Sequence, residues 1–279
     1  MVSTRQVQKT LIGVDIGASK ILVVAGNSQP EIENSMKIAT PDNGGQAVIE
    51  ITHLIEQVAG GQPIAGIHVA SPGPIDRAKG TILKTPNMNW EPLPIVEQLR
   101  NHFRVPVALE KDADAAALAE ATIGAGKGQS SVLYVTISTG VGIGIVINGE
   151  LYHGAHDPEG GHIQIMAEGK SEELETAVAG PAMKRRFGQY GYEITDPKIW
   201  DEYAKDVATG LYDLIITLSP SIVVMGGGVN VHFRKFEQPL LMHLRALKPI
   251  NPLPPIVPAK YMETAVAYGT LILASHLVK

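Results

Sequence analysis

The sequence has no cysteine among its 279 residues, which excludes disulfides, thiolate metal sites and a cysteine nucleophile. It also has no excess of positive charge. The formal net charge is −5, whereas nucleic-acid binders usually carry a basic surface. Long apolar runs are missing near the start, because Gly13, Asp15, Gly17 and Lys20 interrupt the first one. We therefore expect neither a signal peptide nor a membrane span, and a soluble, cytoplasmic protein with no nucleic-acid or membrane partner.

Hydrophobic residues are plentiful at 44%, and charged residues make up 18%, so the chain can bury a large core. Two apolar, β-rich runs, Leu11–Val14 and Ile21–Ala25, flank a glycine turn, which predicts a hairpin. Alternation and helical spacing predict the remaining elements. The further strands expected are 35–39, 64–69, 105–109, 131–137, 143–147 and 222–225, and the helices expected are 46–58, 95–103, 113–123, 172–187, 198–218, 233–247 and 263–277.

The order hairpin, third strand, helix, strand, helix occurs twice. This repeat predicts an α/β protein of two similar lobes with an active-site cleft between them. We expect residues 1–114 to form the N-terminal lobe and residues 115–263 to form the C-terminal lobe.

The first hairpin turn, Asp15–Lys20, is a candidate phosphate site. Asp15 ends a buried strand, where a carboxylate without a partner is costly. It is suited to hold hydrated Mg²⁺, which keeps several waters and bridges to phosphate. Gly17 permits a tight turn whose backbone N–H groups point at an anion, and Ala18, Ser19 and Lys20 complete that turn. An ordinary hairpin turn with a surface aspartate is the alternative.

A second glycine turn, Thr139–Gly144, stands at the corresponding point of the second repeat. Gly140 and Gly142 leave room for a phosphate or another backbone, and Thr139 adds a hydroxyl. A glycine-rich bulge is the alternative. Further along, Gly226-Gly227-Gly228 follows a short strand, where close approach of the backbone to a ligand is plausible and a flexible turn is the rival interpretation.

Two other segments carry acid–base groups. Asp112 lies where a strand passes into a helix, so it is either a helix cap or the base that accepts a proton from an attacking hydroxyl. Glu159 and His162, with Glu175 on the following helix, can bind a polyhydroxyl ligand. A metal site is the rival for these three residues, but their spacing matches no standard zinc motif, and a polar surface loop is the plain alternative.

The ordered set of motifs resembles the ROK family, named for repressors, open reading frames and sugar kinases. The resemblance spans nearly the whole chain. Its motifs match Asp15–Lys20, Ser71–Asp76, Thr85–Asn87, Lys111–Glu120, Thr139–Gly144, Asn148–Leu151, Glu159–His162, Leu174–Glu175 and Ile222–Gly228.

This resemblance implies a duplicated ribonuclease-H-like fold of the actin and hexokinase type, and ATP-dependent phosphorylation of a hexose, with glucose at its 6-hydroxyl as the first expectation. Asp112 would be the general base. Asp15 would hold Mg²⁺ through water, and the glycine segments would line the ATP site. The residues implied to contact the sugar are Gly73, Asn87, Lys111, Asp112, Glu159, His162 and Glu175. The terminal helix would pack back on the N-terminal lobe, so that residues 264–279 join residues 1–114. A homodimer is the family default.

Three departures from the family pattern bear on specificity. The usual cysteine zinc loop is missing between Ile163 and Glu173, so we expect no zinc site, and another group must orient the His162 ring. Lys111 and Asp114 replace two asparagines. The alternatives are therefore a kinase of fructose or of N-acetylated hexosamines, or a non-catalytic sugar-sensing protein. The family's repressors carry an N-terminal DNA-binding domain, for which the roughly ten residues before the first strand are too few.

Overall fold

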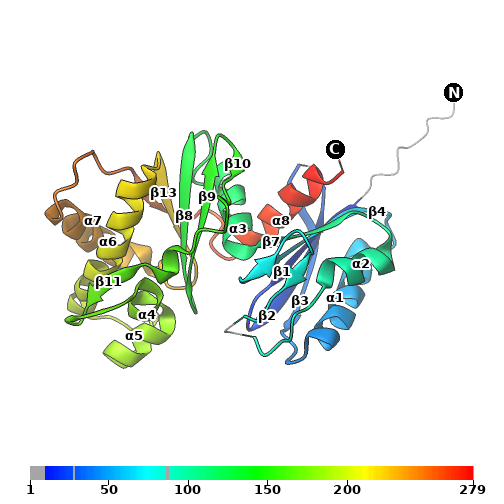
Figure 1. Cartoon of the computed structure of the whole chain (residues 1–279), viewed down its shortest axis with the longest axis horizontal. Coiled ribbons are helices and arrows are strands. Elements are labelled where there is room, and N and C mark those ends of the chain that lie inside the picture. Colours follow the sequence, from blue (N-terminus) through cyan, green and yellow to red (C-terminus); the bar gives the residue numbers. More distant parts are fainter. Residues whose placement is uncertain (1–9, 28, 86–87, 279) are drawn as a thin grey trace. The chain divides into compact units, whose positions relative to one another are not determined.

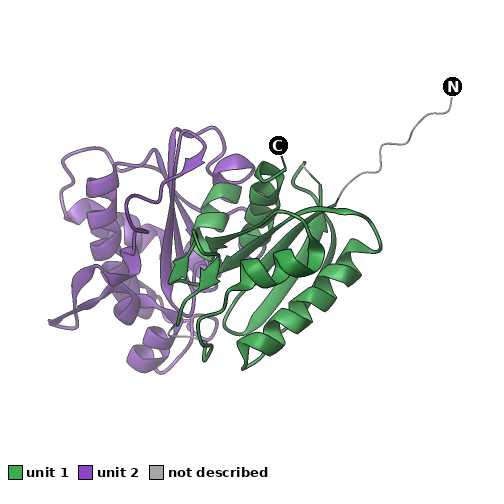
Figure 2. Ribbon diagram, turned by 45° about the vertical axis from the view of Figure 1, so that its right-hand side comes forward, with its two compact units in different colours: residues 1–119, 264–279 green, residues 120–263 purple. Residues whose placement is uncertain are grey.

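The computed structural model describes residues 10–27, 29–85 and 88–278. These residues form two compact units, one of residues 1–119 and 264–279 and the other of residues 120–263. Figure 2 colours the two units and shows that the C-terminal helix belongs to the first. The division falls after Ala119, five residues beyond the point expected from the sequence (119 − 114). The expected cleft between the units stays a prediction.

Unit 1 is built on a five-stranded sheet in the order β3-β2-β1-β4-β7 (Figure 1). β1 pairs antiparallel with β2 and parallel with β4, which in turn pairs parallel with β7. The strands are β1 (Thr10–Ile16), β2 (Lys20–Gly26), β3 (Ile32–Ala39), β4 (Ile64–Ser71) and β7 (Val107–Lys111), and a small separate ribbon joins β5 (Ile75–Asp76) and β6 (Thr81–Ile82).

Helices cover both faces of this sheet. α1 (Gly44–Ala59) and α2 (Ile95–Phe103) contribute their apolar residues to the core on one face. α8 (Ala265–His276) covers the other face, where Leu271 packs on Leu11 and Val24. α3 (Asp112–Thr122) begins in unit 1 and lies close against α8. A Cβ on Gly269 would collide with the backbone of Ala115. This close approach explains the glycine in α8.

Unit 2 repeats the sheet topology in the order β10-β9-β8-β13-β14. β8 pairs antiparallel with β9 and parallel with β13. The positive φ angles of Asn148 and Gly149 form a tight turn between β9 and β10. The strands are β8 (Ser131–Ile137), β9 (Val141–Ile147), β10 (Glu150–Leu151), β13 (Ile222–Gly226) and β14 (Ile256–Pro258).

The helices of unit 2 bury their apolar faces in one core against β8, β9 and β13. They are α4 (Leu174–Val178), α5 (Gly180–Phe187), α6 (Pro197–Leu218) and α7 (Phe233–Ala246), with short 3₁₀ turns η1 (Gly160–His162) and η2 (Asn230–His232). No helix in the described part of the chain is long and apolar enough to cross a membrane.

The prediction of one helix over 172–187 is wrong. Glu172 and Glu173 belong to β12 (Lys170–Glu173), which forms a hairpin with β11 (Gln164–Ala167). The helical part is then interrupted at Ala179, whose extended backbone separates α4 from α5, and Pro181 lies at the start of α5. A proline is well accepted in a first helical turn because its missing N–H is not needed there. The helical periodicity of the segment concealed this break.

Candidate active site

The carboxyl ends of the parallel strands bring Asp15 and Asp112 to one edge of the unit 1 sheet. Asp15 lies near the end of β1 opposite Ala70 of β4, and Ala70 lies opposite Glu110 of β7, two residues before Asp112. Parallel strands place their carboxyl ends at the same edge, which is the usual ligand site of α/β proteins. The two aspartates that the sequence singled out therefore share one edge although 97 positions separate them (112 − 15).

The environment of Asp15 makes its ionised form costly. Burial, followed by the negative charge of Asp112, raises the pKa of the Asp15 carboxyl from 3.8 to about 7, while Lys20 acts in the opposite direction. A second carboxylate close to a desolvated one disfavours the charged form. Near neutral pH this carboxyl is thus poised between its two protonation states. A cation bound at this edge would shift it to the ionised form.

Asp112 is the first residue of α3, and its Oδ1 accepts a hydrogen bond of 2.7 Å from the N–H of Ala113. An anionic side chain is favoured in the first turn of a helix, where unpaired N–H groups carry partial positive charge. Its side chain is only partly buried. Both interpretations of Asp112, the helix cap and the base, are therefore compatible with this placement.

The first glycine turn is closed by backbone hydrogen bonds. The N–H of Gly17 donates to the carbonyl of Lys20 at 2.9 Å, and the hydroxyl of Thr40 donates to the carbonyl of Gly17 at 2.6 Å. A side chain on Gly17 would press against that Lys20 carbonyl at 3.1 Å. Ser19 and Lys20 are exposed at the turn, and Ala18 is half-buried. The turn is thus pre-formed, with small residues at its surface.

The predicted sugar contacts of unit 1 are only partly placed. The turn Ser71–Pro74 follows β4 and includes a cis peptide bond between Gly73 and Pro74. Lys111 ends β7 and is buried, with 5% of its surface exposed. Its backbone N–H donates to Oε1 of Glu110 at 2.8 Å. Asn87 lies outside the described residues.

The sequence interpretation missed an ion cluster beside this edge. Nε of Arg77 donates to Oε1 of Glu110 at 2.6 Å, and its Nη2 contacts Oδ2 of Asp114 at 3.1 Å. Both carboxylates are almost fully buried. Asp114, which stands where the family has an asparagine, therefore has a partner in Arg77. Neither spacing nor composition signals this pairing, since 33 and 37 positions separate the partners (110 − 77 and 114 − 77).

In unit 2 the second glycine turn joins β8 to β9 and is tied to α4. The N–H of Ser138 donates to the carbonyl of Gly140 at 2.8 Å. Oε2 of Glu175 accepts the N–H of Val141 at 2.7 Å, and a Cβ on Gly140 would collide with this carboxylate. Glycine is required at 140 because the side chain of Glu175 fills the space. Thr139 is exposed, and Gly142 lies on β9 opposite Thr136.

The segment Glu159–His162 packs against β9. Cβ atoms on Gly160 and Gly161 would collide with Ile143 and with the carbonyl of Val141. The close approach holds the 3₁₀ turn, and the exposed Glu159 and His162 at its two ends, against the strand that follows the glycine turn.

One further residue escaped the sequence interpretation, namely Glu173. Its Oε2 lies 3.0 Å from Nδ1 of His162. This hydrogen bond, ahead of the charges of Glu175 and Glu159, raises the pKa of the imidazole. The wrong assignment of Glu173 to a helix hid this contact.

The glycine segment 226–228 leaves β13 at the edge where β8 also ends. Gly227 has a φ of +88°, a conformation that glycine adopts freely. The side chain of Asn230, buried and not singled out from the sequence, donates to the carbonyl of Gly226 at 2.6 Å. Around Gly228 a Cβ would meet no atom within 4 Å, so this glycine borders open space.

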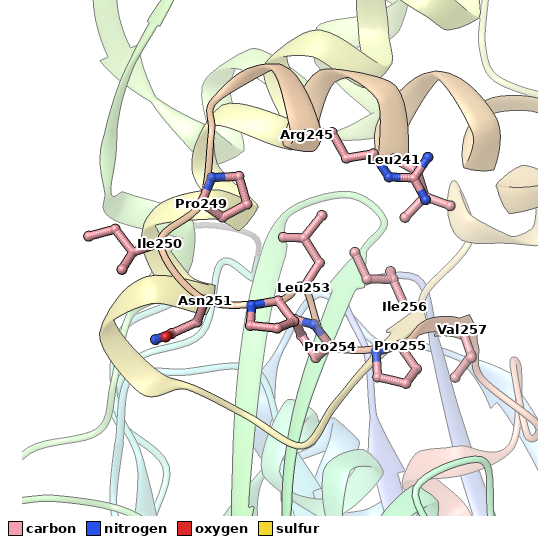
Figure 3. Close-up of a pocket in the computed structure, with 11 residues that line it drawn as sticks. Leu241, Arg245, Pro249, Ile250, Asn251, Leu253, Pro254, Pro255, Ile256 and Val257 are labelled. Carbon is pink, nitrogen blue, oxygen red and sulfur yellow. The ribbon is translucent and has the colours of Figure 1, made fainter.

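A hollow of about 730 Å³ lies elsewhere in unit 2, between α7 and the proline-rich segment 249–257. Figure 3 shows Leu241 and Arg245 of α7 on one side and Leu253, Ile256 and Val257 on the other. None of the residues predicted for catalysis or binding lines it. We therefore do not assign the chemistry to this hollow.

Comparison with known proteins defines the class. The model of the ROK family matches residues 11–276, so the chain belongs to the ROK family. A glucokinase of Halalkalibacterium halodurans is 28% identical, covering 84% of this chain and 85% of its own length. A fructokinase of Lactococcus lactis subsp. cremoris is 28% identical, covering 77% and 78% respectively.

Solved structures agree on the fold. The ROK hexokinase of Thermus thermophilus superposes with a TM-score of 0.82 at 29% identity, covering 95% of this chain and 97% of that one. A ROK glucokinase of Streptomyces griseus, in complex with glucose and AMPPNP, gives a TM-score of 0.83 at 25% identity, covering 96% and 99%. The predicted two-lobed fold of the actin and hexokinase type is thereby confirmed.

Proposed function

We propose that this protein is an ATP-dependent sugar kinase that phosphorylates a hexose, with glucose at its 6-hydroxyl as the first candidate. The observation that carries the proposal is the placement of Asp15 and Asp112 at one edge of the unit 1 sheet, where burial and then the charge of Asp112 raise the pKa of Asp15. Phosphoryl transfer needs a base for the attacking hydroxyl and a carboxylate near the metal that neutralises phosphate charge. This edge supplies one candidate for each role.

Asp112 is the candidate base. Its carboxylate is part-exposed at the edge of the sheet and accepts the N–H of Ala113 with Oδ1. The helix N-terminus favours the ionised form that a base must have. In this role Asp112 would accept the proton as the hydroxyl oxygen attacks the terminal phosphate.

The donor set of Asp15 fits a magnesium ion that binds through water. Its carboxyl carries an electrostatic penalty from burial and from Asp112, and a divalent cation would relieve that penalty. Bound Mg²⁺–ATP supplies the phosphoryl group and neutralises its charge. The protein would hold the phosphates with backbone N–H groups of the turns 17–20 and 139–142 other than those of Gly17 and Val141, which already donate within the protein. Gly226, Gly227 and the open Gly228 would border the nucleotide.

The sugar contacts are proposed from both units. In unit 2 they are Glu159, His162 and Glu175, which offer carboxylate oxygens and an imidazole for hydroxyl groups. Glu175 also accepts the N–H of Val141 and so links the sugar side to the second glycine turn. In unit 1 they are Gly73, Asn87, Lys111 and Asp112. Buried Lys111 is the residue from which we expect this chain's sugar preference to differ from that of its relatives.

The test is a coupled ADP-release assay over glucose, mannose, fructose, allose and N-acetylated hexosamines, with and without Mg²⁺. We expect turnover of at least one hexose that depends on ATP and Mg²⁺. Asp112→Asn should lower kcat by about 10²- to 10⁴-fold because it removes the base. The matched control, Asp213→Asn on the exposed side of α6, should keep the wild-type rate.

Three outcomes separate the alternatives. No turnover on the whole panel would contradict the kinase and favour a sugar-sensing protein, which direct sugar binding would then reveal. An Asp112→Asn variant that keeps its rate would contradict the base but not the kinase. Lys111→Asn should change the ranking of the sugars, and an unchanged ranking would remove Lys111 from the sugar site.

A further inference from the structure

The imidazole of His162 needs a group that fixes its orientation and its tautomer. Histidine has two ring nitrogens, and the partner of one decides what the other offers to a ligand. In this chain the cysteine loop of the family is missing, and the hairpin β11–β12 occupies the segment between His162 and α4. Figure 1 shows β11 beside α4 and α6 in unit 2.

This hairpin is anchored without any metal ligand. Ile165 and Ala167 of β11 are buried in the unit 2 core. At its turn, Glu168 lies 3.5 Å from the guanidinium of Arg186, whose side chain is almost fully buried. Arg186 also contacts Oδ2 of Asp206 at 2.6 Å. The hairpin therefore has its own packing and ion pairs that hold it in place.

Alternation along β12 then sets the direction of its two glutamates. Glu172 is buried and lies 3.5 Å from Lys170. The next side chain, that of Glu173, points to the opposite face of the strand, as neighbouring residues of a strand do. There its Oε2 lies 3.0 Å from Nδ1 of His162. Nε2 of His162 makes no hydrogen bond to any of the residues that the structure describes, so it remains available to a ligand.

We propose that Glu173 is a positioning residue for His162. Its carboxylate holds the proton of the imidazole on Nδ1, so that Nε2 is presented to the sugar. This inference rests on the proposed kinase function. A carboxylate that accepts Nδ1–H makes Nε2 an acceptor in the neutral ring and a donor in the protonated ring. Glu159 and Glu175, the other charged groups that act on the ring, both favour its protonated form. The carboxylate of Glu173 thus orients the His162 ring in a chain that has no cysteine loop to do so.

A contribution to the free energy of unfolding does not explain the contact between His162 and Glu173. The side chain of His162 is 56% exposed and that of Glu173 is 42% exposed. Exposed ion pairs of this kind contribute little to the free energy of unfolding. Removing Glu173 should therefore leave the melting temperature almost unchanged, so that a functional effect can be separated from a loss of folding.

The experiment compares Glu173→Gln, Glu173→Ala and the control Glu150→Gln, an exposed residue of β10 in the same unit. The pH titration of His162 is followed by NMR, with its signal assigned from His162→Gln. Both Glu173 variants should lower the imidazole pKa. Glu173→Ala should also raise the sugar KM by about 3- to 10-fold, the effect of losing one hydrogen bond, with the ATP KM unchanged. The control should change neither quantity.

A double-mutant cycle identifies the route of the effect. If Glu173 acts through His162, Glu173→Ala should raise the sugar KM no further in a His162→Gln background. An equal rise in both backgrounds, or an unchanged imidazole pKa in Glu173→Gln, would overturn the proposal. A wild-type protein that phosphorylates no sugar would overturn the kinase function instead, and the NMR titration alone would then decide whether Glu173 controls the ring.

Discussion

Replacing Asp15 by asparagine should stabilise the protein at alkaline pH and have little pH-linked effect in acid. The native pKa of this carboxyl is about 7, raised from 3.8 by burial and then by Asp112. Below 3.8 both the native and the unfolded chain hold the proton. Between 3.8 and 7 the unfolded chain ionises while the native one keeps its proton, so the native state loses stability as the pH rises. Above 7 the loss is complete.

The magnitude follows from the shift. About 3 pKa units (7 − 3.8), at about 1.36 kcal/mol each, set an upper limit of about 4 kcal/mol. Asp15 keeps part of its surface exposed, so screening by water reduces the expected value to about 2–3 kcal/mol. Because burial is the larger cause, Asp112→Asn should relieve only the smaller part of the penalty.

The assay is denaturant unfolding of the metal-free and nucleotide-free protein at pH 4 and pH 8.5. Comparing the effect of Asp15→Asn at the two pH values cancels any packing change that does not depend on pH. The exposed Asp42→Asn serves as the control and should change stability little at either pH. An equal effect of Asp15→Asn at pH 4 and pH 8.5 would refute the argument that the Asp15 carboxyl is held protonated in the native state.

Two further predictions concern stability in unit 1. Arg77→Met should destabilise the protein by about 3 kcal/mol in denaturant unfolding, because it removes the cation between the buried Glu110 and Asp114; a loss below 1 kcal/mol would contradict this. Burial, above all, lowers the pKa of His68 from 6.5 to about 4, so the native state loses stability as the pH falls through this interval. Between pH 7 and pH 4 the free energy of unfolding of His68→Leu, measured in denaturant, should fall by about 3 kcal/mol less than that of the wild type. Equal decreases in the two proteins would contradict this prediction.

The element order could be predicted well from the sequence because it depends on local patterns. The expected helix at 95–103 and the expected strand at 131–137 match α2 and β8 residue for residue. Period and turn chemistry suffice for such elements, since each lies within one stretch of chain. The prediction for residues 172–187 failed because a strand and two short helices there share the apolar spacing of a single helix. Pairing with β11 makes the first residues of the segment a strand.

The candidate site was predictable in its residue types and not in its contacts. Asp15, Asp112 and His162 stand out as motif residues in the sequence. Glu173 carries no such signal, and neither does Arg77, whose guanidinium lies between two carboxylates. Glutamates and arginines are common on protein surfaces, so their presence in a sequence does not indicate a contact. Only the folded chain shows which of them meet a functional group.

The repeated order of strands and helices, the two glycine turns and the motifs of the ROK family can be recognised in the sequence, since each element or motif consists of residues close together along the chain. The contacts between these elements are visible only in the folded chain. The parallel pairing of β1, β4 and β7 brings Asp15 and Asp112 to one edge, and the β11–β12 hairpin brings Glu173 to His162. Interactions between distant residues depend on strand pairing and register, which burial of the whole core selects.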